Sequence, residues 1–229
     1  MVKHDLIITV FNSYKYLDNI FFVVMNNVSF YNRIIIIDDY SELKFYEQLR
    51  NSLQNFENLI YHRNKLNLGP SYSRNIGVKI SKADYVSFHD PDDYIYSKRF
   101  NYISKIIEKY KPEVLFHDFS LSDIPEEIQF RNIVKLHSGF LYLFKSLYVT
   151  PAVTIKREIL INENGYDNNL RYAEDLDLYI RLRRKYKFYF VTDKLVKISN
   201  RIERRKQSDH ISSNLLLMRN SINKIFLKN

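Results

Sequence analysis

The sequence predicts an α/β fold with a mostly parallel central sheet flanked by helices, and three observations support this prediction. Strand-like and helix-like segments alternate between residues 5 and 119, the order that builds β-α-β units with right-handed crossovers. Several strand candidates are short apolar runs, such as residues 34–37, that end abruptly in polar residues as buried strands do. No linker, repeat or low-complexity stretch interrupts the first 200 residues. We therefore expect one domain over residues 1–200, followed by a small basic helical extension over residues 201–229.

The individual elements follow from the hydrophobic periodicity along the chain. Apolar runs or alternation indicate strands, and apolar residues at helical spacing indicate helices. In the regular part we expect strands over residues 5–10, 33–38, 57–62, 84–89 and 113–119, and helices over residues 13–27, 42–54, 71–81 and 97–110. Beyond residue 120 we expect helices over residues 138–146, 157–163 and 174–186, and strands over residues 151–156, 188–192 and 195–199.

Composition excludes several classes of protein. The 229 residues are 45% hydrophobic, with 19 Tyr and 16 Phe, which is ample for a packed core. No run approaches the ~20 apolar residues of a membrane span, and no signal peptide opens the chain. Cysteine is absent, so nothing indicates an oxidising compartment, and we expect a cytoplasmic protein.

The net charge of +9 is concentrated at the C-terminal end. Residues 181–229 hold 14 Lys and Arg against three Asp and Glu, so all of the basic excess lies there. Such a segment suits anionic lipid, nucleic acid or a pyrophosphate, although a solvated basic face is the commoner explanation. Apolar residues at helical spacing near the end favour packing on the protein body or a second subunit, and docking on an anionic membrane is the alternative.

Three carboxylates directly after a predicted strand are the most informative feature of the sequence. Asp90, Asp92 and Asp93 follow the apolar run of residues 85–88, in a turn that Pro91 favours. Ligands of open α/β sheets bind at the carboxyl ends of the strands, and clustered carboxylate oxygens are what hard divalent cations prefer. The pattern indicates a metal site, while a polar strand-to-helix turn without a metal explains the same residues.

Four further motifs accompany this triplet in a fixed order. They are the strand end Thr9 to Asn12, the Asp pair in residues 38–41, the segment Asn67 to Gly77, and the run that begins at Ala173, Glu174 and Asp175. The ordered set resembles the family 2 glycosyltransferases, which are inverting nucleotide-sugar enzymes of the GT-A fold. The resemblance covers roughly residues 5–200 and implies the nucleotide-diphospho-sugar transferase fold for this chain.

On the donor side, the resemblance implies a nucleotide sugar, for which a UDP-sugar is the first choice. Thr9, Phe11 and Asn12 match the base-binding end of the first strand, where Phe11 could stack on the base and Asp39 could accept a hydrogen bond from its edge. Arg74 matches the family's arginine near the nucleotide, suited to bidentate contact with phosphate or base oxygen. The alternative for Arg74 is an ordinary surface helix arginine.

The resemblance also implies Mn²⁺ or Mg²⁺ at the pyrophosphate, where the cation acts as a Lewis acid. Asp92 would be the principal ligand, with Asp90 toward the ribose or the metal and Asp93 as a second candidate ligand. His210 lies near the basic segment in which many members carry a third ligand, although a lone histidine in a polar loop usually has no such role. Four residues of that segment suit phosphate contact: Arg201, Arg204, Arg205 and Lys206.

The catalytic base implied by the resemblance is Asp175, which would take the proton of the acceptor hydroxyl. A helix that begins there would bury Leu178 and Leu182 and would turn Asp177 toward solvent. The alternative is that Glu174 and Asp175 only favour a helix N-terminus through the macrodipole.

Glycine is scarce, and its positions follow the motifs. The chain has four glycines, and three of them fall inside or beside the motif set: Gly69, Gly77 and Gly165. We expect each to serve a positive φ or a close approach of the backbone.

We therefore expect an inverting glycosyltransferase that moves a sugar to a hydroxyl of a glycan or lipid-linked acceptor in bacterial surface polysaccharide or lipopolysaccharide synthesis. Peripheral contact at the inner face of the cell membrane is the alternative to a cytoplasmic protein without membrane contact. A non-catalytic nucleotide-sugar-binding domain is a second hypothesis, which the presence of Asp90, Asp92 and Asp175 disfavours. An RNA-binding protein is a third, but the signatures of RNA-binding modules are missing, so no nucleic-acid partner is expected. Donor choice would depend on residues 118–150, where no readable code is present.

Overall fold

The computed structural model describes residues 2–54, 56–96, 98–121, 133–136, 149–170, 172–199, 220 and 222–225. Its strands are β1 His4–Val10, β2 Arg33–Asp38, β3 Leu59–Arg63, β4 Tyr85–His89, β5 Tyr94–Ile95, β6 Val114–Ser120, β7 Ile133–Leu136, β8 Val153–Lys156 and β9 Phe188–Lys197. Its helices are α1 Leu17–Asn27, α2 Leu43–Leu53, α3 Pro70–Ile80, α4 Arg99–Tyr110, α5 Arg157–Asn162 and α6 Glu174–Arg183, with short 3-10 turns η1 Tyr14–Tyr16 and η3 Thr150–Ala152.

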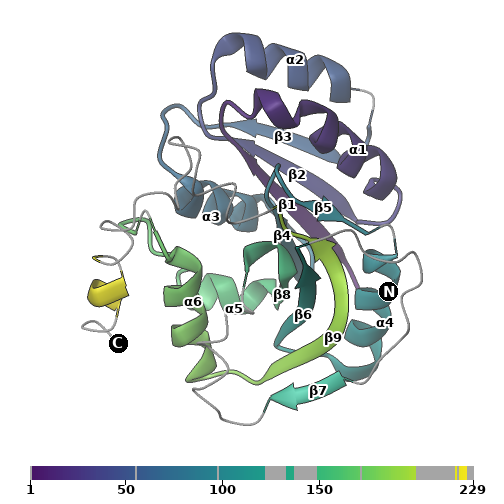
Figure 1. The fold of residues 1–229 in the computed structure, drawn as a ribbon, viewed down its shortest axis with the longest axis vertical. Helices are drawn as coiled ribbons and strands as arrows, with labels where there is room; N and C mark the ends of the chain where they lie inside the picture. The colour runs from purple at the N-terminus through teal and green to yellow at the C-terminus, as the bar shows by residue number, and fades with distance from the viewer. Residues whose placement is uncertain are drawn as a thin grey trace.

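All of these strands form one mixed sheet with the order β3-β2-β1-β4-β8-β6-β9-β5, and β7 pairs with β9 (Figure 1). Strands β3, β2, β1 and β4 are parallel, as are β6 and β9, while β8 runs antiparallel between β4 and β6. The strand order reverses at β1, which has β2 on one side and β4 on the other. In open α/β sheets such a switch point opens a crevice at the carboxyl ends of the strands.

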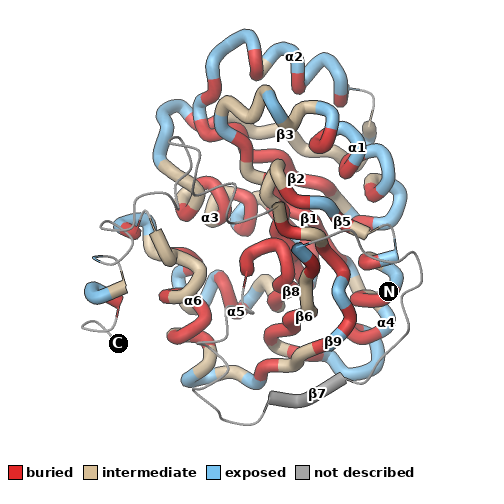
Figure 2. The backbone as a smooth tube through the Cα atoms, viewed as in Figure 1, coloured by how far each residue is buried: buried red, intermediate tan, exposed pale blue. Residues whose placement is uncertain are grey.

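Helices cover both faces of the sheet, because the strands are apolar on both sides. Residues 34–37 of β2 are completely buried, as expected for a strand between two helical layers. One face packs with α3, α5 and α6 in a core that includes Val86, Phe116 and Leu178. The other packs with α1 and α2 around the β1 and β2 side chains, and farther along with α4. Figure 1 shows α5 and α6 on one side of β6 and β9 and α4 on the other, and Figure 2 shows the buried strands between them.

Helix α3 lies unusually close to the sheet, and Gly77 is the reason. A Cβ atom at Gly77 would stand 2.5 Å from Cγ2 of Ile7 in β1, closer than any real contact. The other two motif glycines have positive φ, +88° for Gly69 before α3 and +60° for Gly165. The expectation that glycine marks close approach or positive φ is therefore confirmed at these positions.

The elements expected in the regular part of the chain are confirmed with small shifts at their ends. The prediction of two separate strands over residues 188–192 and 195–199 was wrong, because β9 is one continuous strand. Residues 192–194, at the predicted break, stay in the strand: the pairing with β6 changes register here, and buried Asp193 accepts a hydrogen bond from the Tyr102 hydroxyl at 2.6 Å. The short strands β5 and β7 were not predicted.

Several expectations lie outside the described residues. They concern the helix over residues 138–146, the domain boundary at residue 200 and most of the tail. Within the tail, Ile225 is 1% exposed and belongs to the core cluster that includes the α6 side chains, which favours packing of this point on the protein body. No described helix has the length and apolar character that crossing a membrane requires.

Candidate active site

Arg74 of α3 lies at the centre of the candidate site and joins two motifs that are distant in sequence. Its Nη2 donates to Oδ1 of Asp90 at 3.0 Å, and its Nη1 donates to Oε1 of Glu174 at 2.7 Å. The guanidinium is only 6% exposed and lies 5.4 Å from the centre of the Tyr166 ring. Burial by itself would lower the pKa of Arg74, but the two carboxylates outweigh it and hold that pKa well above its usual value. Arg74, predicted from its motif to contact the nucleotide, thus links the turn of Asp90, Asp92 and Asp93 (the acid turn) to the pair Glu174 and Asp175.

The acid turn is held in place by residues from both ends of the chain. Asn19 of α1 donates through Nδ2 to the carbonyl oxygens of Pro91, at 2.6 Å, and Asp93, at 2.7 Å. Ser199, just after β9, donates from its backbone N to Oδ1 of Asp93 at 2.9 Å and from its hydroxyl to Oδ2 of Asp92 at 3.1 Å. Neither Asn19 nor Ser199 was predicted, because neither belongs to a motif.

These contacts distinguish the three carboxylates of the turn. Asp93 is 1% exposed and fastens the end of β9, which favours a structural role. Asp90 is 26% exposed at its side chain and Asp92 is partly buried, so these two are the better candidates for a cation. Within the described ranges, no three His, Asp or Glu side chains converge as a ready metal site. His210 lies outside those ranges.

Asp39, predicted to contact the base, uses both of its carboxylate oxygens in hydrogen bonds to the loop between β3 and α3. Its Oδ1 accepts from Asn64 Nδ2 at 2.8 Å and from the Leu68 backbone N at 3.0 Å, and its Oδ2 accepts from the Gly69 backbone N at 2.7 Å. Asp39 is 5% exposed. Its observed role is to shape residues 64–69, and a hydrogen bond to a base would add to these contacts.

The end of β1 is locked to the end of β2 beside this loop. Asn12 has a positive φ of 45°, donates from its backbone N to the Ser41 hydroxyl at 2.9 Å, and accepts at Oδ1 from the Glu42 backbone N at 2.8 Å. Phe11 is 50% exposed at the same strand end, and Thr9 is partly buried in β1. The three residues predicted to bind the base therefore lie together at the carboxyl end of β1.

Tyr40, the residue after the Asp pair, contacts Arg63, an arginine that belongs to none of the sequence motifs. Tyr40 has a positive φ of 65°, and the Arg63 guanidinium lies 4.9 Å from its ring and 4.9 Å from the Tyr46 ring. Arg63 also pairs with Asp38, with 3.3 Å between Nε and Oδ2. The ring is held by cation–π contact at the strand ends.

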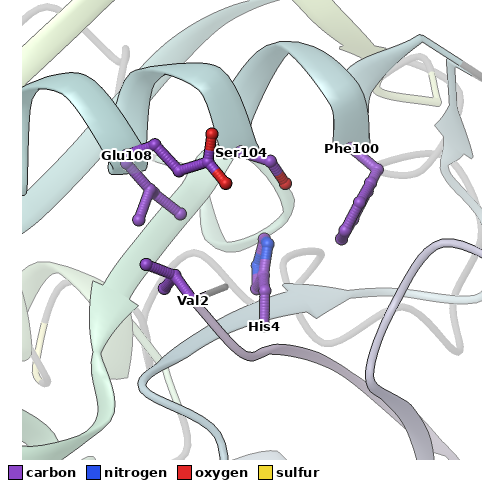
Figure 3. A pocket seen from close by; sticks show the side chains of 6 residues that line it. Val2, His4, Phe100, Ser104 and Glu108 are labelled. Atoms are coloured by element: carbon purple, nitrogen blue, oxygen red, sulfur yellow. The ribbon is translucent and has the colours of Figure 1, made fainter.

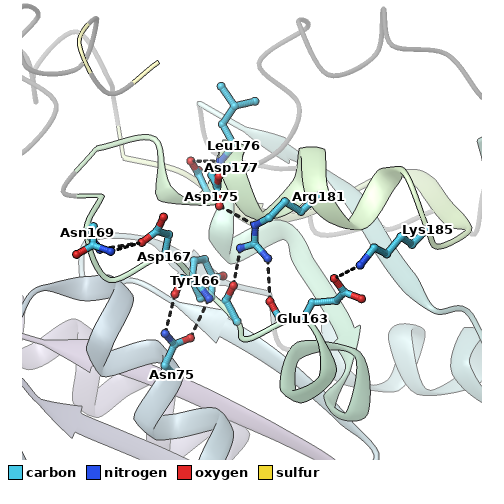
Figure 4. A network of polar contacts seen from close by, with 11 residues as sticks. Asn75, Glu163, Tyr166, Asp167, Asn169, Asp175, Leu176, Asp177, Arg181 and Lys185 are labelled. Atoms are coloured by element: carbon cyan, nitrogen blue, oxygen red, sulfur yellow. Dashed lines mark hydrogen bonds and ion pairs between the residues drawn. The ribbon is translucent and has the colours of Figure 1, made fainter. Parts of the chain in front are cut away.

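In the first turn of α6, Asp175 and Asp177 have different surroundings. Asp175 lies in the first turn of α6, partly buried, and its Oδ1 accepts from the Leu176 backbone N at 2.7 Å. The expectation that Asp177 faces solvent was wrong: it is fully buried and its Oδ2 accepts from Arg181 Nε at 2.8 Å (Figure 4). Arg181 in turn donates to the carbonyl oxygens of Glu163, at 2.9 Å, and Gly165, at 2.6 Å, which explains the burial of its partner.

A small cavity of about 70 Å³ lies elsewhere, between β1 and α4 (Figure 3). His4, Phe100 and Glu108 are among its lining residues, and none of the motif residues lines it. His4 Nε2 pairs with the Ser87 hydroxyl at 2.9 Å, and burial, with a smaller effect of Arg99, lowers the pKa of His4 to about 3. This neutral histidine belongs to the core rather than to the candidate site.

Comparison with known proteins agrees with the sequence pattern. Residues 5–151 match the family described as Glycosyl transferase family 2. The uncharacterized glycosyltransferase MJ1057 of Methanocaldococcus jannaschii is 30% identical over 176 residues, which are 72% of this chain and 58% of that protein. The minor teichoic acid biosynthesis protein GgaB of Bacillus subtilis is 28% identical over 48% of this chain and 12% of its own length. The chain thus spans about half the length of the first of these relatives and less of the second.

Among solved structures, residues 1–349 of S. aureus TarS in complex with UDP-GlcNAc superimpose with a TM-score of 0.73 and 20% identity, over 99% of this chain and 66% of that TarS fragment. At this identity the likeness concerns the fold. It confirms the predicted GT-A architecture.

Proposed function

Because this chain belongs to glycosyl transferase family 2, we propose that it transfers a sugar from a nucleotide-diphosphate donor to a hydroxyl group of an acceptor. The observation that carries this proposal is the double ion pair of Arg74 with Asp90 and Glu174. It brings the acid turn, suited to a donor, next to the Glu-Asp pair, suited to an acceptor, at the switch point of the sheet.

We propose a UDP-sugar as the donor, with its base at the ends of β1 and β2. The half-exposed Phe11 ring offers a stacking surface, and Asp39, which organises the loop of residues 64–69, is bonded through its backbone N to the Val10 carbonyl oxygen, next to Phe11 in the chain. The complex of TarS with UDP-GlcNAc, a protein of the same fold, supports this choice.

Asp92 and Asp90 would hold a Mn²⁺ or Mg²⁺ ion. Two incompletely buried carboxylates at the carboxyl end of β4 fit such a cation, because hard divalent ions take oxygen ligands. When bound, the cation would neutralise charge on the pyrophosphate leaving group. Asp90 also pairs with Arg74, so the principal ligand would be Asp92.

Asp175 would act as general base toward the acceptor hydroxyl. With Asp175 as the base and no covalent glycosyl-enzyme intermediate, the acceptor oxygen would bond to the anomeric carbon as its bond to the nucleoside diphosphate breaks, and the configuration at that carbon would invert. For the acceptor we propose a glycan or lipid-linked surface polymer, which the similarity to GgaB supports, with the basic residues after 181 favouring work at an anionic membrane face.

The donor proposal is tested by thermal shift with nucleotide sugars, because a bound ligand raises the melting temperature by mass action. A UDP-sugar with Mn²⁺ should raise it, EDTA should remove the effect, and Asp92→Ala should weaken binding. Glu47→Ala, an exposed acidic residue of α2, is the control and should bind as the wild type does. Equal affinity for the nucleoside diphosphate with and without EDTA would contradict the metal site.

The catalytic proposal is tested by Asp175→Asn, which should keep donor affinity and lower turnover by about 10²-fold or more. Asp18→Asn, an exposed acid in the first turn of α1, changes the same kind of helix position and should leave turnover unchanged. NMR of the anomeric proton of the product should show a configuration opposite to that of the donor sugar. Normal turnover in Asp175→Asn would remove this residue from the mechanism, and a retained configuration would exclude direct displacement.

A further inference from the structure

Asn75, the residue after Arg74, makes an unusually complete set of contacts with a loop on the acceptor side. Its Oδ1 accepts from the Tyr166 backbone N at 2.9 Å, and its Nδ2 donates to the Tyr166 carbonyl oxygen at 2.8 Å (Figure 4). The same Nδ2 also donates to Asn168 Oδ1 at 2.9 Å. The side-chain amide thus pairs with the backbone of Tyr166 in both directions, much as a neighbouring strand would.

The sequence of the loop is shaped by this contact. A Cβ atom at Gly165 would stand 2.2 Å from Asn75 Oδ1, so a larger residue there would force the amide away. Gly165 also has a φ of +60°, which side chains other than glycine adopt at a cost. Glycine therefore serves two requirements at once at this position.

The same loop is held from its other side by α6. Arg181 donates to the carbonyl oxygens of Glu163 and Gly165, and buried Asp177 orients its guanidinium. Because the loop is hydrogen-bonded to α3 through Asn75 and to α6 through Arg181, it fixes the position of α6 relative to α3.

The loop also supports the central arginine. The Tyr166 ring is 1% exposed, lies edge-on to Phe88 of β4 at 5.5 Å between ring centres, and stands under the Arg74 guanidinium. Fixing the Tyr166 backbone therefore also fixes a surface on which Arg74 rests.

We infer that Asn75 is a positioning residue, which latches the loop of residues 165–168 to α3 and so sets the place of Asp175 relative to the donor. The inference rests on the proposed function. A general base acts only within hydrogen-bond reach of its proton, and a displacement of about 1 Å costs on the order of 10²-fold in rate. Loss of the latch should therefore lower kcat while donor binding, which depends on the ends of β1, β2 and β4, persists.

The first test is Asn75→Ala in the whole chain. We expect kcat to fall about tenfold or more, by the sensitivity of catalysis to position, with the donor KM within about twofold of wild type. Asn26→Ala is the matched control, because Asn26 is an exposed helical asparagine whose Nδ2 also donates to a backbone oxygen, that of Phe22. A lower melting temperature with kcat unchanged would overturn the inference, since it would show a purely structural role.

The second test is a double-mutant cycle with Gly165→Ala. Each single substitution breaks the same latch, so the double variant should have nearly the kcat of Asn75→Ala rather than the product of the two losses. Independent, multiplying losses would overturn the inference.

Amide hydrogen exchange separates the latch from the proposed function. Asn75→Ala should increase exchange over residues 164–177 and leave residues 64–69 as protected as in the wild type. A wild-type chain without transferase activity would overturn the proposed function. The exchange measurement then decides the latch by itself, and unchanged protection over residues 164–177 would refute it.

Discussion

Replacement of Arg74 by Met tests whether the central ion pairs hold the site together. The apolar side chain of Met has similar length but supplies no charge to Asp90 or Glu174. Both acids would remain near their present positions, with Glu174 13% exposed and Asp90 26% exposed at their side chains. The less exposed Glu174 should carry most of the penalty, because an uncompensated charge costs more where water is excluded.

The expected magnitude follows from the two hydrogen bonds that are lost. Bonds to charged groups each contribute about 1.5–3 kcal/mol, and breaking a buried pair typically costs about 3–5 kcal/mol. For a chain of this size that is a fall of roughly 10 °C in melting temperature. Arg74→Met with Glu174→Gln should lose less than Arg74→Met alone, because the second change removes the stranded charge.

The assay is equilibrium unfolding in denaturant for the wild type, both single variants and the double variant. A positive coupling of about 1 kcal/mol or more between positions 74 and 174 is expected for residues in direct contact. Arg74→Lys should recover only part of the loss, because one ammonium cannot match the fork that reaches both carboxylates. If Arg74→Met costs less than about 1 kcal/mol, or if the two losses simply add, the ion pairs do not organise the site.

Three further predictions concern stability. Burial lowers the pKa of His4 to about 3 and that of His117 well below its usual value, so below about pH 6.5 the unfolded chain binds more protons than the folded chain. As the pH falls from 6.5 to 5, the free energy of unfolding should therefore decrease by up to about 1.4 kcal/mol per pH unit for each histidine. His4→Gln should make the melting temperature depend less on pH in this range. Gly77→Ala should destabilise by about 1–3 kcal/mol, because the new Cβ meets Ile7, with part of the loss restored by Ile7→Val; a stabilised variant in denaturant unfolding would disprove this packing. The Tyr166 hydroxyl is buried without a hydrogen-bond partner in the part of the chain that the structure describes, so Tyr166→Phe should leave the melting temperature unchanged or raise it.

The sequence predicted most of the fold because its strands are locally unambiguous. Residues 34–37 are apolar on both sides and end in Asp38 and Asp39, a pattern that only a covered parallel strand explains well. The continuous β9 was not predictable, because the buried carboxylate at its centre, Asp193, is bonded by the hydroxyl of Tyr102, which lies in a helix distant in sequence.

The sequence proposed candidate residues for the site but could not predict the contacts between them. Arg74 and Asp90 were identified from motif position, yet their pairing depends on how α3 packs on the sheet. For Asp177 a local signal existed, since Arg181 stands four residues later, but its burial depends on the loop of residues 163–165. Asn19 and Ser199 gave no signal, because an isolated polar residue near a helix or strand end is usually solvated.

Helix α3 connects the whole site because three consecutive polar residues on it point in different directions. Successive helical side chains are about 100° apart, so neighbours reach different partners. The Ser73 hydroxyl accepts a hydrogen bond from Asn64, which also donates to Asp39. Arg74 joins the acid turn to α6. Asn75 donates to the Tyr166 carbonyl oxygen in the loop before α6. The glycine at position 77 lets this helix lie directly on β1. A segment whose motif suggests a nucleotide-binding arginine thus also connects the residues after β2, the turn after β4 and the start of α6 through its own side chains.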